Sequence, residues 1–337
     1  MVNNTNISRL LLAATVAMAG LYVLSSCDKV SATGILVGGT GVDDRVEMSY
    51  LYYKNELSSG VTSIVDGDYT FLVGADSHIA EDTCRLAEMF QISLENEDLF
   101  CAHLGDLADT KPEYYILTRQ CVAGAKRRFV EKYYDYEDEF KDYVKDKETG
   151  DVSSYDDVVF PFFPVVGNHD ITHNGWALFQ SIFGSSFYEF DVFVDGTEVY
   201  DHFIFLDSAN GTFGRKQLDY IEEGLMDADE ETVHLRNTFV FTHTNFFRPS
   251  RTQFASTLPR EEMYYMLNKF EQWQCTAVFC GHVHAWDQRR FGTVEYFTLD
   301  SMGERNSPAA GEYLVRVTCK KNGEVKYEKV RMNYEAK

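Results

Sequence analysis

The sequence predicts a layered α/β fold, for three reasons. Apolar runs typical of strands alternate with segments typical of helices from residue 69 to residue 134. Later in the chain several strands follow one another with no helix between them, which indicates a mixed sheet or two sheets packed face to face. Five predicted strands each end on residues of metal-binding type. The pattern permits a four-layer α/β/β/α sandwich with two mixed β-sheets, whose ligands collect outside the carboxyl ends of the strands.

The start of the chain is typical of an exported protein. It carries one positive side chain, Arg9, before an uncharged, mostly apolar run at residues 10–24. This run is too short to span a bilayer comfortably, so we expect residues 1–26 to be a signal peptide. Residues 24–27 resemble the lipobox of a bacterial lipoprotein, in which Cys27 would be lipidated. An ordinary cleaved signal or an anchor helix is the alternative.

Lipidation would decide where the protein works. Two or three acyl chains on Cys27 would hold it stably on a membrane of the cell envelope, outside the cytoplasm and facing the periplasm or the cell surface. Residues 27–42, which are small and glycine-rich for most of their length, then serve as a tether. We expect residues 43–337 to form a single domain, because two domains would have to share the candidate ligands at 76–284.

The predicted elements follow the periodicity of the chain. Helices are expected at residues 44–57, 83–92, 112–134, 215–225 and 260–273. Strands are expected at residues 69–73, 99–104, 160–166, 188–194, 203–206, 238–241, 277–280, 295–299, 313–319 and 325–331, with 291–297 resembling a strand pair. The tyrosine-rich, acidic stretch 133–157 is expected to be a solvated insertion or, alternatively, a lid over the site.

Charge limits the range of partners. The chain has 31 basic and 53 acidic side chains, a net charge of −22, and loss of residues 1–26 would remove only Arg9 from this count. Such a surface repels polyanions, so long nucleic acid is not expected as a partner. A small phosphorylated substrate remains possible, because bound cations would dominate the local field at the site. The sequence does not indicate an oligomeric state.

The cysteines leave two possibilities open. Six follow Cys27, at positions Cys84, Cys101, Cys121, Cys275, Cys280 and Cys319. Several fall in or at the end of predicted strands, where a free thiol behaves as a small buried apolar group, but an exported protein can also form disulfides. None has the C-x-x-C spacing of a structural zinc site, so any metal must be bound by His and Asp.

Candidate metal ligands stand at the ends of the five strands. In chain order these residues are Asp76, His78, Gly105, Asp106, Gly167, Asn168, His169, Asp170, His243, Gly281, His282 and His284. Their histidines, carboxylates and amide suit two divalent cations rather than one. The glycines fit tight turns that bring the backbone close to an ion.

In order, these motifs read Asp-x-His, Gly-Asp, Gly-Asn-His-Asp, a lone His and Gly-His-x-His, and they resemble the calcineurin-like metallophosphoesterase superfamily. The resemblance implies a four-layer sandwich and a metal-dependent phosphoric ester hydrolase. It also implies two metal ions, whose identity among manganese, iron, zinc and cobalt the ligands do not decide. One would be held by Asp76, His78, Asp106 and His284, and the other by Asp106, Asn168, His243 and His282, so that Asp106 bridges them.

The resemblance also implies a mechanism. A metal-bridging hydroxide would attack a phosphomonoester or phosphodiester while His169 protonates the leaving oxygen and Asp170 orients His169. A structural role at the turn is the alternative for His169. Asp109, three residues after Asp106, is expected either to support the ligands from behind or to be an ordinary loop carboxylate.

Departures from known subfamilies narrow the function. Purple acid phosphatases have a tyrosine ligand at the position of Asp109, and serine/threonine protein phosphatases have an Asp-Arg-Gly run there, whereas Thr110 and Lys111 follow here. Periplasmic nucleotidases add a large carboxyl-terminal domain, for which the chain beyond His284 is short. What remains resembles the cyclic-nucleotide diesterase and small phosphatase branches.

The substrate pocket is weakly marked in the sequence. Asn245, Phe246 and Arg248 follow His243 and could supply stacking and phosphate contacts, or they could form a loop packed on the sheet. A non-catalytic metal-binding or scaffold protein on the same fold is the alternative function. The complete ligand set argues for an enzyme, because a chain that had lost catalysis would be expected to lack at least one of these residues.

Overall fold

The computed structural model describes residues 40–52, 62–80, 83–109, 111–135, 143–223, 234–247, 258–303 and 313–332. The predicted signal peptide, Cys27 and almost all of the tether lie outside the described residues. None of the described helices is long and apolar enough to cross a membrane.

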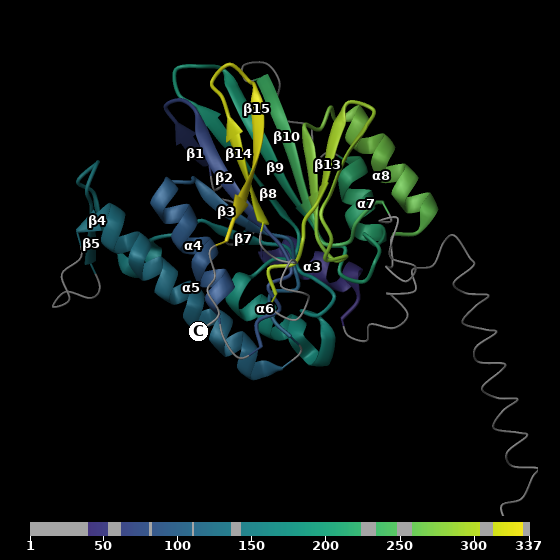
Figure 1. Ribbon diagram of the computed structural model, residues 1–337, viewed down its shortest axis with the longest axis horizontal. Helices are drawn as coiled ribbons and strands as arrows, with labels where there is room; N and C mark the ends of the chain where they lie inside the picture. The colour runs from purple at the N-terminus through teal and green to yellow at the C-terminus, as the bar shows by residue number, and fades with distance from the viewer. Residues whose placement is uncertain are drawn as a thin grey trace, which may run out of the picture.

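Two large sheets form the centre of the molecule (Figure 1). The seven-stranded sheet has the order β1 (Thr62–Val65), β8 (Tyr188–Val194), β9 (Val199–Leu206), β10 (His234–Thr242), β11 (Ala277–Cys280), β13 (Val294–Thr298), β12 (Asp287–Phe291). The five-stranded sheet has the order β15 (Val325–Arg331), β14 (Tyr313–Cys319), β2 (Tyr69–Gly74), β3 (Phe100–His103), β7 (Phe162–Pro164). Both sheets mix parallel and antiparallel pairs, as the sequence predicts.

The inner faces of the two sheets enclose an aromatic core. Phe71 of β2 stacks on Phe100 of β3 at 4.9 Å between ring centroids and meets Phe203 of β9 edge-on at 5.4 Å. All three side chains are buried, and alternate residues of each strand join the same cluster. This contact between the strands of different sheets makes the fold a sandwich rather than one continuous sheet.

Helices cover both outer faces and complete the four layers. The five-stranded sheet packs against α4 (Cys84–Asn96), α5 (Pro112–Tyr133) and α6 (Gly175–Phe183). The seven-stranded sheet packs against α3 (Val42–Tyr52), α7 (Arg215–Glu223) and α8 (Arg260–Gln272). Short 3₁₀ helices lie at Tyr155–Asp157 and Thr172–Asn174. The predicted α/β/β/α architecture is therefore confirmed.

Most predicted elements are present, and the differences concern short elements and element bounds. The sequence interpretation missed β1, a strand of four residues, and α6, a helix of nine. It placed a strand pair at 291–297, whereas the hairpin consists of β12 and β13 with its turn between Phe291 and Val294.

The acidic insertion contains a small third sheet, of β4 (Tyr134–Asp135), β5 (Tyr143–Asp146) and β6 (Val152–Ser154). Val130, Val144 and Val158 pack together beneath it. Figure 1 places β4 and β5 beside the outer end of α5, away from the carboxyl ends of the central strands. This position agrees with an insertion and does not favour a lid.

The strand directions create one edge where loops converge. The strands β2, β3 and β7 pair in parallel in one sheet, and β9, β10 and β11 do so in the other. Their carboxyl ends therefore meet at the same edge of the sandwich. Cys101, Cys121, Cys275, Cys280 and Cys319 are free and buried, which agrees with the first of the two possibilities, core thiols, for these five described residues.

Candidate dinuclear metal centre

The loops at this edge are held side by side by backbone hydrogen bonds. The N–H of Asp76 donates to Gly105 O at 3.1 Å, and the N–H of His78 donates to Asp106 O at 3.0 Å. In the other sheet, the N–H of Gly281 donates to His243 O at 3.0 Å. The strand-end motifs that are far apart in the sequence therefore share one small space.

The first group of ligands contains Asp76, His78, Asp106 and His284, and one ligand atom from each lies within 4.8 Å of all the others. The two Nε2 atoms of His78 and His284 are 3.1 Å apart. Nε2 of His284 lies 3.5 Å from Asp76 Oδ1, and that of His78 lies 3.7 Å from Asp106 Oδ2. This is the set that the resemblance implies for one metal.

The second group contains Asp106, His243 and His282. Nε2 of His243 lies 3.5 Å from Asp106 Oδ2 and 3.2 Å from Nδ1 of His282. Asn168 joins this group, with its Oδ1 2.9 Å from Nε2 of His243. Asp106 is common to both groups, as a bridging carboxylate must be.

The spacing of the ligand atoms fits bound cations. Neighbouring ligands at right angles around an ion, each about 2.1 Å from it, are about 3 Å apart. The pairs His78–His284, His243–His282 and His243–Asn168 have separations of 3.1, 3.2 and 2.9 Å. Nitrogen and oxygen atoms that converge in this way could hold a cation between them.

The backbone is bent where it presents these ligands. Asp76, His78, Asp106, His282 and His284 all have φ between 44° and 74°. Residues other than glycine seldom adopt this left-handed backbone conformation, and strained residues of this kind cluster at functional sites. The bend turns the side chains at the strand ends inward, so that strands of two different sheets supply one centre.

A hydrogen bond to the backbone fixes the orientation of the His243 ring. Its Nδ1 donates to Leu104 O at 2.7 Å, which directs the lone pair of Nε2 toward Asp106 and Asn168. Burial lowers the pKa of His243, but the carboxylates of Asp106 and Asp76 outweigh burial and raise it overall. Burial raises the pKa of Asp106, yet His243 and His78 outweigh that effect and hold it well below its usual range. The Asp106 carboxylate is therefore ionised at neutral pH.

The structure gives Asp170 a different set of contacts from the one expected. Its Oδ2 accepts the N–H of Gly167 at 2.8 Å, and its Oδ1 accepts the N–H of Leu107 at 3.1 Å and the hydroxyl of Tyr115 at 2.8 Å. Burial and the charge of Asp106 raise the pKa of Asp170 to about 6. These hydrogen bonds join the loop that carries Asp106 to the loop that carries Asn168. Among the described residues, the partners of the Asp170 carboxylate do not include the ring of His169.

The carboxylate beside the His169 ring is that of Asp109. Oδ1 of Asp109 lies 3.7 Å from Nδ1 of His169 and 3.1 Å from Nδ1 of His78. The rings of His78 and His169 meet edge-on at 4.7 Å between centroids. The His169 side chain is 41% exposed, whereas Asp109 is buried, so His169 alone of this pair is open to a substrate.

The predicted substrate loop is mostly enclosed. Phe246 is buried among side chains of α8 and β13, and Asn245 is buried with its Nδ2 donating to Phe247 O at 2.6 Å. Neither side chain has surface left to contact a substrate, so the structure does not support them as substrate residues. Arg248 lies outside the described residues.

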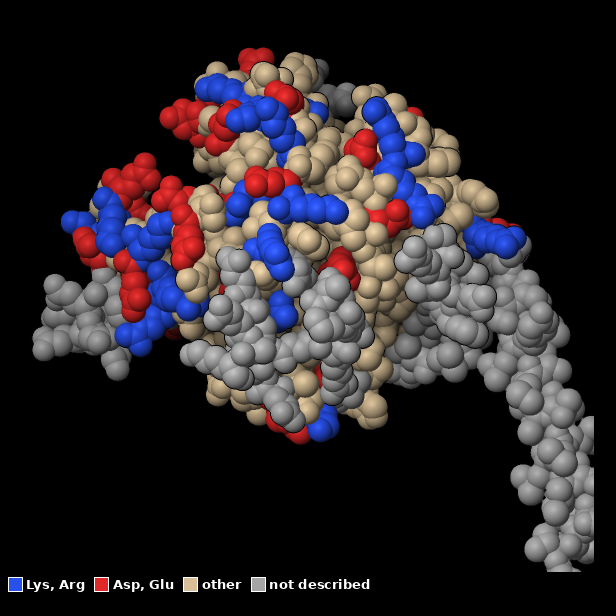
Figure 2. Space-filling view, in the orientation of Figure 1, with Lys and Arg blue, Asp and Glu red and all other residues tan. Residues whose placement is uncertain are grey.

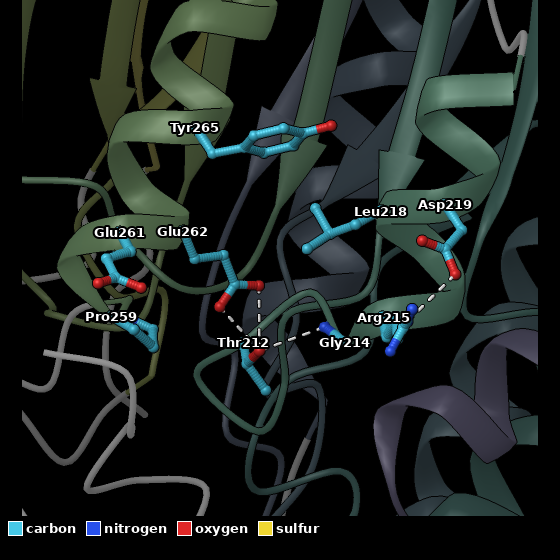
Figure 3. A pocket seen from close by; sticks show the side chains of 9 residues that line it. All are labelled: Thr212, Gly214, Arg215, Leu218, Asp219, Pro259, Glu261, Glu262 and Tyr265. Atoms are coloured by element: carbon cyan, nitrogen blue, oxygen red, sulfur yellow. Dashed lines mark hydrogen bonds and ion pairs between the residues drawn. The ribbon is translucent and has the colours of Figure 1, made fainter. Parts of the chain in front are cut away.

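A pocket of about 570 Å³ lies apart from this centre, between the first turns of α7 and α8 (Figure 3). Arg215, Asp219 and Glu261 line it together with Tyr265. The carboxylate of Glu262, also in its wall, accepts the hydroxyl of Thr212 at 2.8 Å. None of the candidate metal ligands lines it, so the chemistry of the metal centre does not take place there.

The chain is similar to known proteins in sequence pattern and in fold. A family model described as calcineurin-like phosphoesterase matches residues 69–286, well over half of the chain. A purple acid phosphatase from seeds of yellow lupin (Lupinus luteus) is 11% identical, with a TM-score of 0.50, over 79% of this chain and 52% of its own. A dimetal phosphatase from Danio rerio is 12% identical, with a TM-score of 0.48, over 79% of this chain and 99% of its own. None of the curated proteins compared with the chain matches it.

Proposed function

Because the chain belongs to the calcineurin-like phosphoesterase family and is thus a metal-dependent phosphoric ester hydrolase, we propose that it hydrolyses small phosphomonoesters or phosphodiesters at the centre around Asp106. The observation that carries this proposal is the pair of ligand groups that share the Asp106 carboxylate. A single carboxylate with two oxygens can hold two cations about 3.5–4 Å apart, as in other two-metal hydrolases.

Each ligand has a distinct task in this proposal. Asp76, His78 and His284 would hold one cation and Asn168, His243 and His282 would hold the other, and Asp106 would contribute to both. Bound divalent cations supply an activated water at neutral pH and neutralise charge on the phosphoryl oxygens. The buried carboxylates and the hydrogen bond from His243 to Leu104 O fix the ligands before a substrate arrives.

His169 supplies the proton in this proposal. Its partly exposed ring stands beside the ligand group, and a donor placed there can protonate the oxygen of the leaving alcohol. The carboxylate nearest to this ring is that of Asp109, 3.7 Å from Nδ1 and beyond hydrogen-bond distance, so its effect on His169 is electrostatic. Asp170 instead has a positioning role in this proposal, because its hydrogen bonds join the two loops that carry Asp106 and Asn168.

We also propose that the enzyme is exported and anchored outside the cytoplasm by a lipid on Cys27. The support is the sequence of residues 1–27 alone, which combines an apolar run with a cysteine at its boundary. Incorporation of a radiolabelled fatty acid into the wild-type chain but not into a Cys27→Ser variant would test it. Labelling of both variants alike would contradict the anchor.

Hydrolysis of bis(p-nitrophenyl) phosphate by residues 28–337, supplied with manganese, tests the enzymatic proposal beside a chelator-treated control. Turnover that the chelator abolishes would identify a metal-dependent phosphodiesterase. If the diester is stable, p-nitrophenyl phosphate is the next substrate. Failure of both esters with metal bound would contradict hydrolysis and favour a non-catalytic role.

A further inference from the structure

A lysine is held between two aromatic rings at the open edge of the sandwich. Nζ of Lys329, on β15, lies 3.7 Å from the centroid of the Trp286 ring and 5.6 Å from that of Tyr313. An ammonium over an aromatic face is attracted by the electron density of the ring. The rings therefore fix the position of a charge that would otherwise move freely on a long side chain.

Core contacts fix the rings as well. Trp286 packs against Phe297 of β13 at 6.2 Å between centroids, and Phe297 packs against Tyr327 of β15 at 4.6 Å. These contacts connect β15, the edge strand of the smaller sheet, to the β12–β13 edge of the larger one. Lys329 thus stands on a rigid junction of the two sheets.

This junction lies beside the metal centre. Trp286 is two residues after the ligand His284, and Lys329 is in register with Val315 and, through it, with Val73, three residues before Asp76. At about 3.3 Å per residue and 4.8 Å between strands, the α-carbons of Lys329 and of Gly74, the last residue of β2, are roughly 10 Å apart. Asp76 follows Gly74 by two residues. Arg331, two residues further toward the centre, lies on the same face of β15 as Lys329.

The charge of this edge differs from that of the whole chain. The protein has a net charge of −22, yet Figure 2 shows several Lys and Arg side chains, with Asp and Glu among them, along the strip that β14 and β15 occupy in Figure 1. Within the described part of the chain, the contacts of Lys329 Nζ are the two rings. Rings accept no proton from it in a conventional hydrogen bond, so its N–H donors remain available to an anion.

We propose that Lys329, positioned by Trp286 and Tyr313, binds a second anionic group of the substrate, so that the preferred substrates are phosphoesters carrying a further phosphate or carboxylate several bonds from the scissile phosphorus. This inference rests on the proposed hydrolase function, since it assigns a specificity residue to the same site. The metal centre binds the phosphoryl group that is cleaved, and Lys329 binds the distal anion. Arg331 adds positive charge between the two.

Two ligands that this chemistry does not cleave test the proposal without turnover. Butylphosphonate carries one anionic group, and butane-1,4-diylbisphosphonate carries the same group with a second one four carbons away. Isothermal titration of the manganese-loaded residues 28–337 should show the bisphosphonate binding about tenfold more tightly, the gain expected of one charge-assisted contact. In Lys329→Met the gain should fall to about twofold or less.

Lys326→Met is the matched control. Lys326 lies on the same strand but on its opposite face, is 59% exposed and pairs with Glu324 at 3.4 Å. It should retain the tenfold gain, and both variants should keep the wild-type unfolding temperature. Equal affinity of the wild type for both ligands, no binding of either, or equal losses in the two variants would overturn the proposal. If the affinity gain is intact but no nitrophenyl ester is hydrolysed, the hydrolase function fails and the anion site stands.

Discussion

The α-carbon of Gly167 lies directly against the Asp106 carboxylate, which both ligand groups share. A β-carbon added at residue 167 would lie 2.2 Å from Asp106 Oδ1 and 2.2 Å from the Asp106 backbone nitrogen. Real β-carbons do not approach other atoms so closely, and the atoms here belong to a buried carboxylate and to the backbone. The absence of a side chain at this turn is therefore a condition for the position of Asp106.

Gly167→Ala should accordingly abolish the centre. The added methyl must displace either Asp106 or the turn that carries Asn168 and His169, so both ligand groups lose their shared member. We expect loss of most bound manganese and a fall in hydrolysis of 10² or more, since two-metal catalysis depends on both ions. Metal content by atomic absorption and the nitrophenyl ester assay measure the two effects.

Gly124→Ala is the control for this substitution. Gly124 lies inside α5, and a β-carbon there would meet nothing within 4 Å. Alanine should leave metal and activity unchanged and stabilise the helix by about 0.5–1 kcal/mol. Full metal content in Gly167→Ala would contradict the steric argument.

His169→Asn should separate proton donation from metal binding. His169 is in neither of the two ligand groups that share Asp106, and lies instead with His78 and Asp109 in a third group that could hold an ion. Both cations at Asp106 should therefore remain bound. Removal of a general acid costs about 10²–10⁴ in rate, and we expect kcat to fall by at least the lower figure. The loss should be smaller for substrates whose leaving group needs no proton, so p-nitrophenyl esters and alkyl esters should be compared.

His173→Asn is the parallel control. His173 is exposed in the same turn and has φ of 50°, a conformation that asparagine tolerates. It should keep wild-type rates for every ester. Equal activity of His169→Asn and the wild type on alkyl esters would remove His169 from the mechanism.

The sequence predicted the ligand positions because each follows a strand. An apolar run that ends on Asp, His or Asn marks the carboxyl edge of a sheet, and parallel strands bring such ends together whatever their order. Asp76 and His284, 208 positions apart in numbering, could therefore be assigned to one site without knowledge of the sheet order. In the structure, Nε2 of His284 lies 3.5 Å from Oδ1 of Asp76.

Contacts that depend on sheet order and turn geometry were not predictable in this way. The sequence assigned the orientation of His169 to its neighbour Asp170, but the turn points Asp170 toward Gly167 and Tyr115. The Lys329–Trp286 contact requires β15 and β12 to be edge strands on the same side, which periodicity does not specify. Burial of Phe246 beneath α8 likewise follows from the path of the loop rather than from its composition.

Arg45→Met should destabilise the fold without touching the metal ligands. Arg45 is fully buried in α3, where Nε and Nη2 each donate to a different oxygen of Asp207 at 2.8 Å. Methionine fills similar space but leaves Asp207 as an uncompensated buried charge, which costs about 3–5 kcal/mol. Urea unfolding followed by fluorescence measures the loss.

The double variant Arg45→Met/Asp207→Asn tests the cause. If an unpaired charge is responsible, neutralising Asp207 should recover a good part of the loss, so the two single effects will not add. Nη2 of Arg45 also donates to Asn210 Oδ1 at 2.8 Å, so recovery should be incomplete. Additive losses would instead assign the effect to packing of α3.

His202 should give the stability of the protein a pH dependence that is independent of the metal centre. Its Nδ1 lies 2.6 Å from Asp191 Oδ1 and its Nε2 lies 3.1 Å from Glu189 Oε2, across the β8–β9 pair. Burial lowers the pKa of His202, but the hydrogen bonds to Asp191 and Glu189 outweigh burial and raise it to about 9. The folded protein therefore binds this proton more tightly than the unfolded chain does.

The pKa of His202 is higher in the folded protein than the value of about 6.5 in the unfolded chain, so its contribution to stability must fall as the pH rises. The stabilisation is complete below about pH 6.5 and is lost as the pH rises through about 9. His202→Gln should thus reduce the free energy of unfolding by on the order of 1–3 kcal/mol at pH 6 and by much less at pH 9.5. His234→Gln, at an exposed position at the start of β10, should show no such trend. Urea unfolding at both pH values measures the difference, and a loss in His202→Gln that is the same at pH 6 and pH 9.5 would mean that the ring acts by packing rather than by charge.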